Sequence, residues 1–241
     1  MCGMISTFTP AVPVQEAGNA TLRSLTLAGP AGRLEALLNN GAANAPYAAV
    51  VCHPHPKGGG TMHNKVVYHA MKALNAPEFG LCWPVLRLNF RGTGLSEGTH
   101  DGKAETGDLL AAIDWIENEF KRPVVVVGFS FGAAMSLLAC CNGAYGRSAQ
   151  KDLRALVALG LPTRAEGREY SYSFLPQCSL PKLFLSGDCD QFAPAADLQR
   201  VAATSAEPKK LVLLPGADHF FAGQLEAMQN ELVNWLKEQL P

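Results

Sequence analysis

The sequence predicts a protein of the α/β class, with a mainly parallel β-sheet covered by helices on both faces. From Tyr47 onward, short apolar runs alternate along the chain with longer segments of helical periodicity. The apolar runs are rich in Val, Leu and Ala and have no polar face, which is typical of strands buried on both sides of a parallel sheet. Ligands bind such sheets beyond the carboxyl ends of the strands, so we expect the functional site among the residues that follow each strand.

An antiparallel pair of strands is expected to begin the sheet. Residues 21–27 alternate apolar and polar side chains, as a half-buried strand does. Residues 29–32 have the sequence Gly-Pro-Ala-Gly, which favours a turn, and residues 33–38 then form a second strand that ends at Asn39.

The later elements alternate between strand and helix. Pro77 limits the first helix, and acids separate the apolar residues of segment 106–120, as in an amphipathic helix. Segment 123–127, Pro-Val-Val-Val-Val, is the strongest strand signal because it is β-branched and has no polar face. The further expected strands are residues 47–52, 85–90, 123–127, 153–159, 182–186 and 210–214, and the expected helices are residues 66–74, 106–120, 133–141, 195–203 and 224–240.

Length and composition indicate a folded chain with a large core. The 241 residues suit one larger α/β domain or two small ones, and 48% of them are hydrophobic while 17% are charged. Residues 1–20 are poorly patterned and contain Pro10 and Pro13, so we expect an irregular arm there. Neither a linker nor a repeat interrupts residues 21–241, which we expect to form a single domain.

Charge and hydropathy argue against several classes of partner. The formal net charge is −1, and no run of Lys and Arg is present, so we expect no binding to nucleic acid or to an anionic membrane surface. No apolar run is long enough to span a bilayer, and the first residues lack the pattern of a signal peptide. We therefore expect a cytoplasmic protein.

The cysteines are expected to be reduced and structural. Seven are present, an odd number without C-x-x-C spacing, and several lie in apolar segments where a thiol behaves as a small hydrophobic group. This fits a reducing compartment and gives no indication of a zinc site. They are Cys2, Cys52, Cys82, Cys140, Cys141, Cys178 and Cys189.

The strongest functional motif follows the Val-rich strand. Residues 128–132 have the sequence Gly-Phe-Ser-Phe-Gly, which is G-x-S-x-G between a strand and a helix, the context of a nucleophile elbow. Such a tight turn imposes a strained backbone on Ser130, and side chains at Gly128 and Gly132 would collide with neighbouring elements. The helix N-terminus would favour negative charge that develops beside the hydroxyl. We predict Ser130 as a nucleophile; the alternative is a Gly-rich turn without a chemical role.

A serine nucleophile needs a base and an orienting acid. His219 is the one His that follows Ser130, and it lies in the loop after strand 210–214, which makes it the predicted base. The loop after strand 182–186 offers both Asp188 and Asp190. We favour Asp190, which lies farther out on the loop, and expect Asp188 to bond to loop N–H groups.

Two other acids are weaker candidates for the same role. Glu166 follows the preceding strand, and Asp218 is too close in sequence to His219 to orient it easily.

The loop after strand 47–52 is expected to complete the site. The backbone N–H of Phe131 is the predicted first oxyanion donor, and the N–H of His55 the second. Pro54 and Pro56 have no N–H and would stiffen the backbone around His55.

These loops could instead form a metal site, a phosphate-binding loop or a dinucleotide-binding loop. The sequence argues against each, so we expect neither a metal nor a cofactor. His53, His55, His63 and His69 include an H-x-H pair, but no carboxylate or Cys set accompanies them, and bracing of the loop by the first two is favoured. Gly58-Gly59-Gly60-Thr61 lacks the form of a phosphate-binding P-loop. Segment 92–98 resembles a dinucleotide fingerprint only superficially, because its third Gly comes one position late.

These segments together resemble a known family. The motifs at 53–56, 59–67 and 88–98, with the elbow and the loops at 187–194 and 217–220, resemble the small lidless α/β-hydrolases of bacteria, related to dienelactone hydrolases and small carboxylesterases. The resemblance covers the chain from about Thr21 and implies a Ser-Asp-His triad, with Asp190 as the acid. Dienelactone hydrolases proper use Cys as nucleophile where this chain has Ser130, which weakens a lactone assignment.

The expected function is that of a serine hydrolase that cleaves a carboxylic ester through an acyl-enzyme. Segment 161–180 leaves room for a loop or a short helix but not for a lid domain. An open site would accept a small-molecule ester with a short acyl chain, or an ester on a larger molecule. The side chains that could line an acyl pocket are Phe129, Phe131, Phe192, Phe220 and Phe221. The alternatives are a thioesterase or serine peptidase of the same fold and a non-catalytic binding protein; a homodimer is compatible with all of them.

Overall fold

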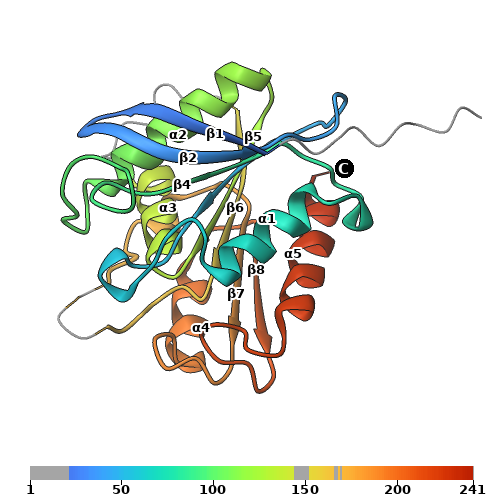
Figure 1. Cartoon of the computed structure of the whole chain (residues 1–241). Helices are drawn as coiled ribbons and strands as arrows, with labels where there is room; N and C mark the ends of the chain where they lie inside the picture. Colours follow the sequence, from blue (N-terminus) through green and yellow to red (C-terminus); the bar gives the residue numbers. More distant parts are fainter. Residues whose placement is uncertain (1–21, 144–151, 166–167, 169, 241) are drawn as a thin grey trace, which may run out of the picture.

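The computed structural model describes residues 22–143, 152–165, 168 and 170–240, which form an eight-stranded sheet with helices on both faces (Figure 1). The arm expected at residues 1–20 lies outside the described residues. The strands are β1 (Leu22–Gly29), β2 (Gly32–Asn39), β3 (Ala48–Cys52), β4 (Val85–Leu88), β5 (Val124–Phe129), β6 (Leu153–Leu159), β7 (Lys182–Gly187) and β8 (Lys209–Leu214). The helices are α1 (Lys65–Asn75), α2 (Glu105–Phe120), α3 (Phe131–Cys141), α4 (Ala195–Thr204) and α5 (Leu225–Gln239), with short 3-10 helices η1 (Pro56–Gly58), η2 (Pro77–Phe79) and η5 (Leu175–Gln177).

The sheet is mainly parallel and begins with an antiparallel pair, as predicted. Its strand order is β1-β2-β4-β3-β5-β6-β7-β8, in which β2 runs antiparallel to both β1 and β4 while the other neighbours are parallel. The carboxyl ends of β3, β5, β7 and β8 therefore lie at one edge of the sheet, where ligands bind in this class of fold.

Two helical layers bury both faces of the central strand. Along β5, Val124 and Val126 pack in a core with α2, α3 and α4, whereas Val125 and Val127 pack in a second core with α1 and α5. Successive side chains of a strand point to opposite faces, so two cores require the uninterrupted apolar run that the sequence shows. Figure 1 shows α2 and α3 on one side of the sheet and α1 and α5 on the other. None of the helices described is both long and apolar enough to cross a membrane.

The strand expected at 85–90 ends at Leu88 in the structure. The N–H of Asn89 still donates to the carbonyl oxygen of Glu35 in β2, but that of Phe90 binds the loop after β3. The N–H of Phe90 donates to His53 Nε2 at 3.0 Å, and Asn89 Oδ1 accepts from the N–H of Met62 at 2.8 Å. The chain therefore leaves β4 at Leu88 and binds the loop that follows β3.

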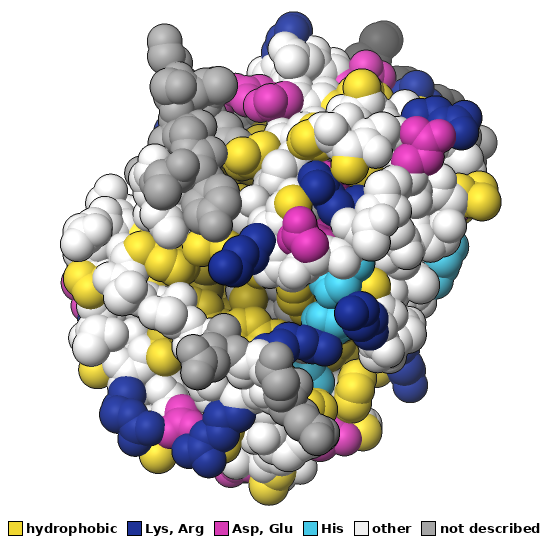
Figure 2. Space-filling model, turned by 90° about the vertical axis from the view of Figure 1, so that its left-hand side faces the viewer, with side chains coloured by type: hydrophobic (Ala, Val, Ile, Leu, Met, Phe, Trp, Pro, Cys, Tyr) yellow, Lys and Arg dark blue, Asp and Glu magenta, His cyan; other side chains and the backbone are white. Residues whose placement is uncertain are grey.

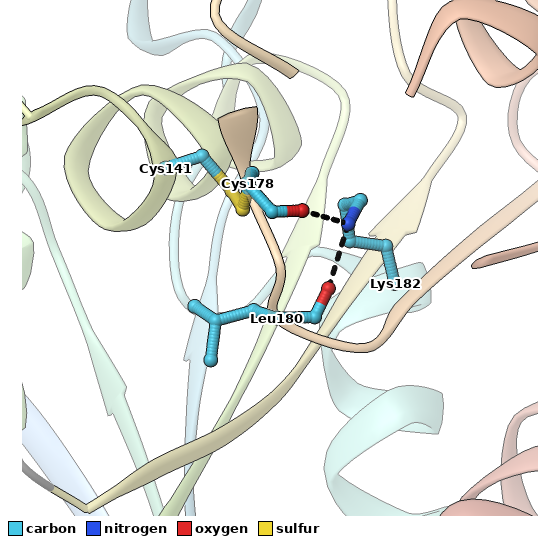
Figure 3. The surroundings of a disulfide bond; sticks show 4 residues. All are labelled: Cys141, Cys178, Leu180 and Lys182. Carbon is cyan, nitrogen blue, oxygen red and sulfur yellow. Dashed lines mark hydrogen bonds between the residues drawn. A yellow bond between two sulfur atoms is a disulfide. The ribbon is translucent and has the colours of Figure 1, made fainter. Parts of the chain in front are cut away.

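The expectation that every cysteine is reduced is wrong for two of the seven. Cys141, the last residue of α3, is bonded to Cys178, which follows η5 (Figure 3). The two are 37 residues apart and come within 5.1 Å at their Cα atoms through the tertiary fold, so no local spacing could reveal the pair. Lys182 braces the same turn by donating to the carbonyl oxygens of Cys178 and Leu180 at 2.6 and 2.7 Å (Figure 3). The inference of a reducing compartment therefore loses this support.

A buried ion pair attaches the loop after β4 to α2. Asp108, whose side chain is fully buried, accepts hydrogen bonds from the backbone N–H of Arg91 at 2.9 Å and from Nη2 of its guanidinium at 2.7 Å. Arg91 is 8% exposed, so little water reaches either group and each charge is compensated mainly by the other.

Substituting Asp108→Asn should lower the free energy of unfolding by about 3–5 kcal/mol, because it leaves the Arg91 charge buried without a counterion. Urea denaturation measures this change. Asp152→Asn is the matched control: Asp152 pairs with Arg154 at 3.5 Å where both side chains are about half exposed, so we expect less than about 1 kcal/mol. Equal effects in the two variants would contradict the prediction.

Candidate active site

Ser130 occupies a strained turn between β5 and α3. Its backbone has φ 55° and ψ −118°, a conformation that costs a residue with a side chain about 1–3 kcal/mol. A Cβ atom at Gly128 would lie 2.3 Å from the carbonyl oxygen of Gly132, and one at Gly132 would lie 2.6 Å from that of Cys52. Glycine is therefore required on both sides of Ser130, for the steric reason inferred from the motif.

A chain of hydrogen bonds connects Ser130 to His219 and Asp190. His219 Nε2 lies 2.9 Å from Ser130 Oγ, and His219 Nδ1 lies 2.8 Å from Asp190 Oδ2. The structure thus brings together three sequence-predicted residues that follow β5, β8 and β7. In this arrangement the serine hydroxyl donates to Nε2 when Nδ1–H donates to the carboxylate, which is the proton arrangement that serine nucleophiles use.

The carboxylate of Asp190 is held by further donors. Ser186 Oγ donates to Oδ2 at 2.9 Å, and the N–H groups of Phe192 and Ala193 donate to Oδ1 at 2.8 and 3.1 Å. Burial acts to raise the pKa of Asp190, but the hydrogen bond and charge of His219, together with these donors, outweigh it and lower the pKa below its ordinary value. Asp190 therefore stays charged beside the imidazole.

The other candidate acids lie elsewhere. Asp188 is exposed, and its Oδ1 accepts from the N–H of Gly216 at 2.7 Å, so it stabilises the adjoining loop. Asp218 accepts through Oδ1 from the N–H of Phe220 at 3.0 Å. Glu166 lies outside the described residues.

Aromatic rings enclose the His219 imidazole. Ring centroids of Phe192, Phe129 and Phe220 lie 4.7, 5.1 and 5.2 Å from that of His219, and Phe221 is fully buried behind Phe129. Of the five Phe expected around an acyl pocket, these four therefore surround or support the histidine. Phe131 lines a cavity of about 650 Å³.

Gly160 leaves the space that this imidazole needs. It has φ 53°, and a Cβ atom there would lie 3.2 Å from His219 Nδ1 and 3.1 Å from the ring of Phe129. Gly160→Ala should therefore displace the imidazole and lower kcat by about 10- to 100-fold on any ester that the protein hydrolyses.

Gly223→Ala is the control for backbone strain. Gly223 has φ 73° and open space where a Cβ would lie, so both substitutions should destabilise the fold by about 1–3 kcal/mol. Steady-state kinetics beside thermal unfolding separates the two effects. A similar loss of kcat in both variants would contradict a role for space at Gly160.

The backbone N–H groups predicted as oxyanion donors make no hydrogen bond within the described residues. In the described part of the chain, neither the N–H of Phe131, the first residue of α3, nor that of His55 donates a hydrogen bond. The rings of the two residues are 5.0 Å apart at their centroids. His55 precedes η1, where its Nδ1 accepts from the N–H of Lys57 at 3.1 Å.

His53 stabilises the loop that follows β3 and connects it to the end of β4. Its Nε2 accepts from the N–H of Phe90, and its Nδ1 lies 2.6 Å from the carbonyl oxygen of Pro54, to which it donates. Burial lowers the pKa of His53 to about 4, so the ring is neutral and can make both bonds. His69 instead contacts Gln229, and in the described ranges no group of three or more metal-binding side chains forms.

Sequence reasoning missed two residues beside His55. His100 Nε2 lies 3.0 Å from His55 Nε2, and His100 Nδ1 is 2.7 Å from the buried carboxylate of Glu105. Glu105 also accepts from the N–H groups of Asp101 and Gly102, both at 3.0 Å. An acid at a helix start is normally solvated, so no feature of the local sequence predicts the burial of Glu105.

Two adjoining hollows, which share Arg168, Tyr170 and Ser171, are lined by residues beside the candidate site. One, of about 650 Å³, is lined by Phe131, His55 and residues of α3, and the other, of about 620 Å³, by Phe192, Gln191 and Thr163. Figure 2 shows a hollowed face with a hydrophobic floor and with Lys, Arg and His side chains around it.

Comparison with known proteins identifies the family and fold of the chain. Residues 59–237 match the family described as "Alpha/beta hydrolase domain". An uncharacterized protein from Rickettsia prowazekii is 34% identical over 217 residues, 86% of either chain. A lidless α/β serine hydrolase from Xanthomonas campestris is 30% identical with a TM-score of 0.76 over 97% of this chain and 99% of that one. An α/β serine hydrolase homologue from Coxiella burnetii is 32% identical with a TM-score of 0.77 over 89% and 97%. The chain therefore belongs to the α/β-hydrolase family and has the fold of its lidless serine hydrolases.

Proposed function

We propose that the protein is a serine esterase that hydrolyses small carboxylic esters through an acyl-enzyme. The observation that carries this proposal is the hydrogen-bonded chain of Ser130, His219 and Asp190 on a strained turn at a helix N-terminus. A serine hydroxyl in contact with a carboxylate-oriented imidazole is the arrangement that acyl transfer requires.

Each residue has one role in the proposed reaction. Ser130 Oγ attacks the ester carbonyl while His219 Nε2 takes its proton, and Asp190 stabilises the resulting imidazolium. The N–H groups of Phe131 and His55 hold the oxyanion. His219 then protonates the leaving alcohol, and a water molecule activated by the same imidazole releases the acid.

The surroundings of Ser130 support an open site and a small ester substrate. The described part of the connection between β6 and β7 contains only the short helix η5, so the connection holds no inserted domain above the site. A cavity of about 650 Å³ is within the size range of small-molecule sites.

A series of p-nitrophenyl esters from acetate to laurate tests the proposal, together with a fluorophosphonate probe. We expect turnover of the shorter esters and a single covalent adduct that mass spectrometry places on Ser130. Absence of both turnover and labelling would overturn the proposal, and an adduct on another residue would overturn the assigned nucleophile.

A further inference from the structure

The larger cavity runs along one face of α3, away from Ser130. The helix residues that line it are Phe131, Ala134, Met135 and Leu138. Their spacing of i, i+3, i+4 and i+7 forms one apolar stripe, and at 1.5 Å per residue it extends over about 10 Å. The floor of the cavity is thus an apolar track that begins beside the nucleophile.

The opposite wall is aromatic and is fixed in place. Tyr170, Tyr172 and Phe174 line it, and the hydroxyl of Tyr172 donates to the carbonyl oxygen of Pro162 at 2.6 Å. Beyond this wall, the disulfide between Cys141 and Cys178 ties the end of α3 to the residue after η5. The disulfide therefore connects α3, which forms the floor of the cavity, to the segment that follows the aromatic wall.

Charged side chains at this cavity are mostly cationic. Lys57, Lys103 and Arg168 line it, and they face one carboxylate, that of Asp101, which already accepts from the N–H groups of Lys103 and Ala104. Dark-blue Lys and Arg side chains surround the hydrophobic floor in Figure 2. A chain with a formal net charge of −1 thus gathers three cations around one hollow.

These cations are exposed and have no acidic partner among the described residues. Within the described ranges, the side chains of Lys57, Lys103 and Arg168 form no ion pair, whereas Arg33 pairs with Glu97 and Arg164 with Asp197. Unpaired cations beside an apolar cavity are available to an anionic ligand.

The positive charge acts at the Ser130 end of the cavity. The pKa of His55 is lowered to about 4, first by burial and then by the charges of Arg168, His100 and Lys57. Arg168 and Lys57 are therefore close enough to His55, which lines the same cavity, for their charges to act on its imidazole.

The two hollows adjoin, because Arg168, Tyr170 and Ser171 line both, and they differ in the residues that they do not share. The leaving oxygen must reach His219 Nε2, and the imidazole packs against Phe192, which lines the smaller hollow. Phe131 and His55, the proposed carbonyl-oxygen donors, line the larger one. The alcohol is therefore assigned to the part of the smaller hollow beside Phe192, and the acyl group to the part of the larger hollow along α3.

We propose that the substrates are esters whose acyl part carries a carboxylate, namely half-esters of dicarboxylic acids, bound by Lys57, Lys103 and Arg168 with the acyl chain along α3. This inference rests on the proposed esterase function. Arg presents a fork that matches a carboxylate, and Lys contributes a compact charge, so the set suits a carboxylate beside an apolar chain.

Matched esters test the proposal by pH-stat titration. Monomethyl adipate and methyl hexanoate share a six-carbon acyl chain and differ in the terminal carboxylate. We expect kcat/KM for the half-ester to exceed that for the neutral ester by roughly 10-fold, and the ratio to fall by roughly 10-fold or more in the double variant Lys57→Met with Lys103→Met. Added salt should lower the rate on the half-ester more than the rate on the neutral ester.

Lys72→Met is the matched control, because Lys72 pairs with Glu78 on the surface and does not line the cavity. Its ratio should equal that of the wild type. A ratio that stays the same in the double variant, or a wild-type preference for methyl hexanoate, overturns the inference and leaves the esterase function standing. Hydrolysis of neither ester, in a protein that also resists fluorophosphonate labelling, shows that the esterase proposal itself has failed.

Discussion

Replacing Ser130 by Ala is expected to lower kcat/KM on any hydrolysed ester by about 10⁴- to 10⁶-fold. The substitution removes the atom that attacks the carbonyl and leaves an imidazole without a proton to transfer. The proposed oxyanion donors, the N–H groups of Phe131 and His55, are left in place and would still bind the substrate, so KM should change much less than kcat. Stopped assays of the best p-nitrophenyl ester, with burst kinetics on the wild type, measure both quantities.

Ser136→Ala controls for the loss of a hydroxyl from the same helix. Ser136 is buried in α3 and donates to the carbonyl oxygen of Gly132 at 2.7 Å without contacting His219. We expect this variant to keep most of the wild-type rate and to react with fluorophosphonate, whereas Ser130→Ala should do neither. Turnover that survives in Ser130→Ala would show that another group carries the reaction.

The elements that could be predicted from sequence are those specified by local pattern. The run at 124–127 needs no tertiary information to be recognised as a doubly buried strand, and the glycines at 128 and 132 indicate the turn because only a close backbone approach requires both. Strand ends were less predictable. The strand at β4 ends early because His53, far away in the sequence, takes the N–H of Phe90.

The rest of the site depends on contacts between distant segments. Cys141 and Cys178 carry no spacing signal, and the contact of His100 with His55 joins two loops that follow different strands. The apolar stripe of α3 looks like ordinary core in the sequence, since periodicity alone cannot tell which half of a buried face borders a cavity. The chemistry of Asp188 and Asp190 is identical, so only the fold shows which carboxylate reaches His219.

Asp190→Asn is expected to reduce kcat by about 10⁴-fold with little change in substrate binding. The N–H groups of Phe192 and Ala193 donate to Oδ1, so the amide oxygen of Asn should take that place. Its NH₂ group would then face His219 Nδ1 and donate to it. The imidazole would carry its proton on Nε2, where it can no longer accept the proton of Ser130.

Asp188→Asn makes the same chemical change two residues away in the same turn. Asp188 Oδ1 accepts from the N–H of Gly216 at 2.7 Å, and an Asn oxygen can do the same, so the rate should stay within a few-fold of the wild type. Steady-state kinetics of the pair assigns the acid directly. A large loss in Asp188→Asn with activity retained in Asp190→Asn would reverse the assignment. Equal losses would mean that the turn needs both charges to keep His219 in reach of Ser130, and the orienting role would then not belong to Asp190 alone.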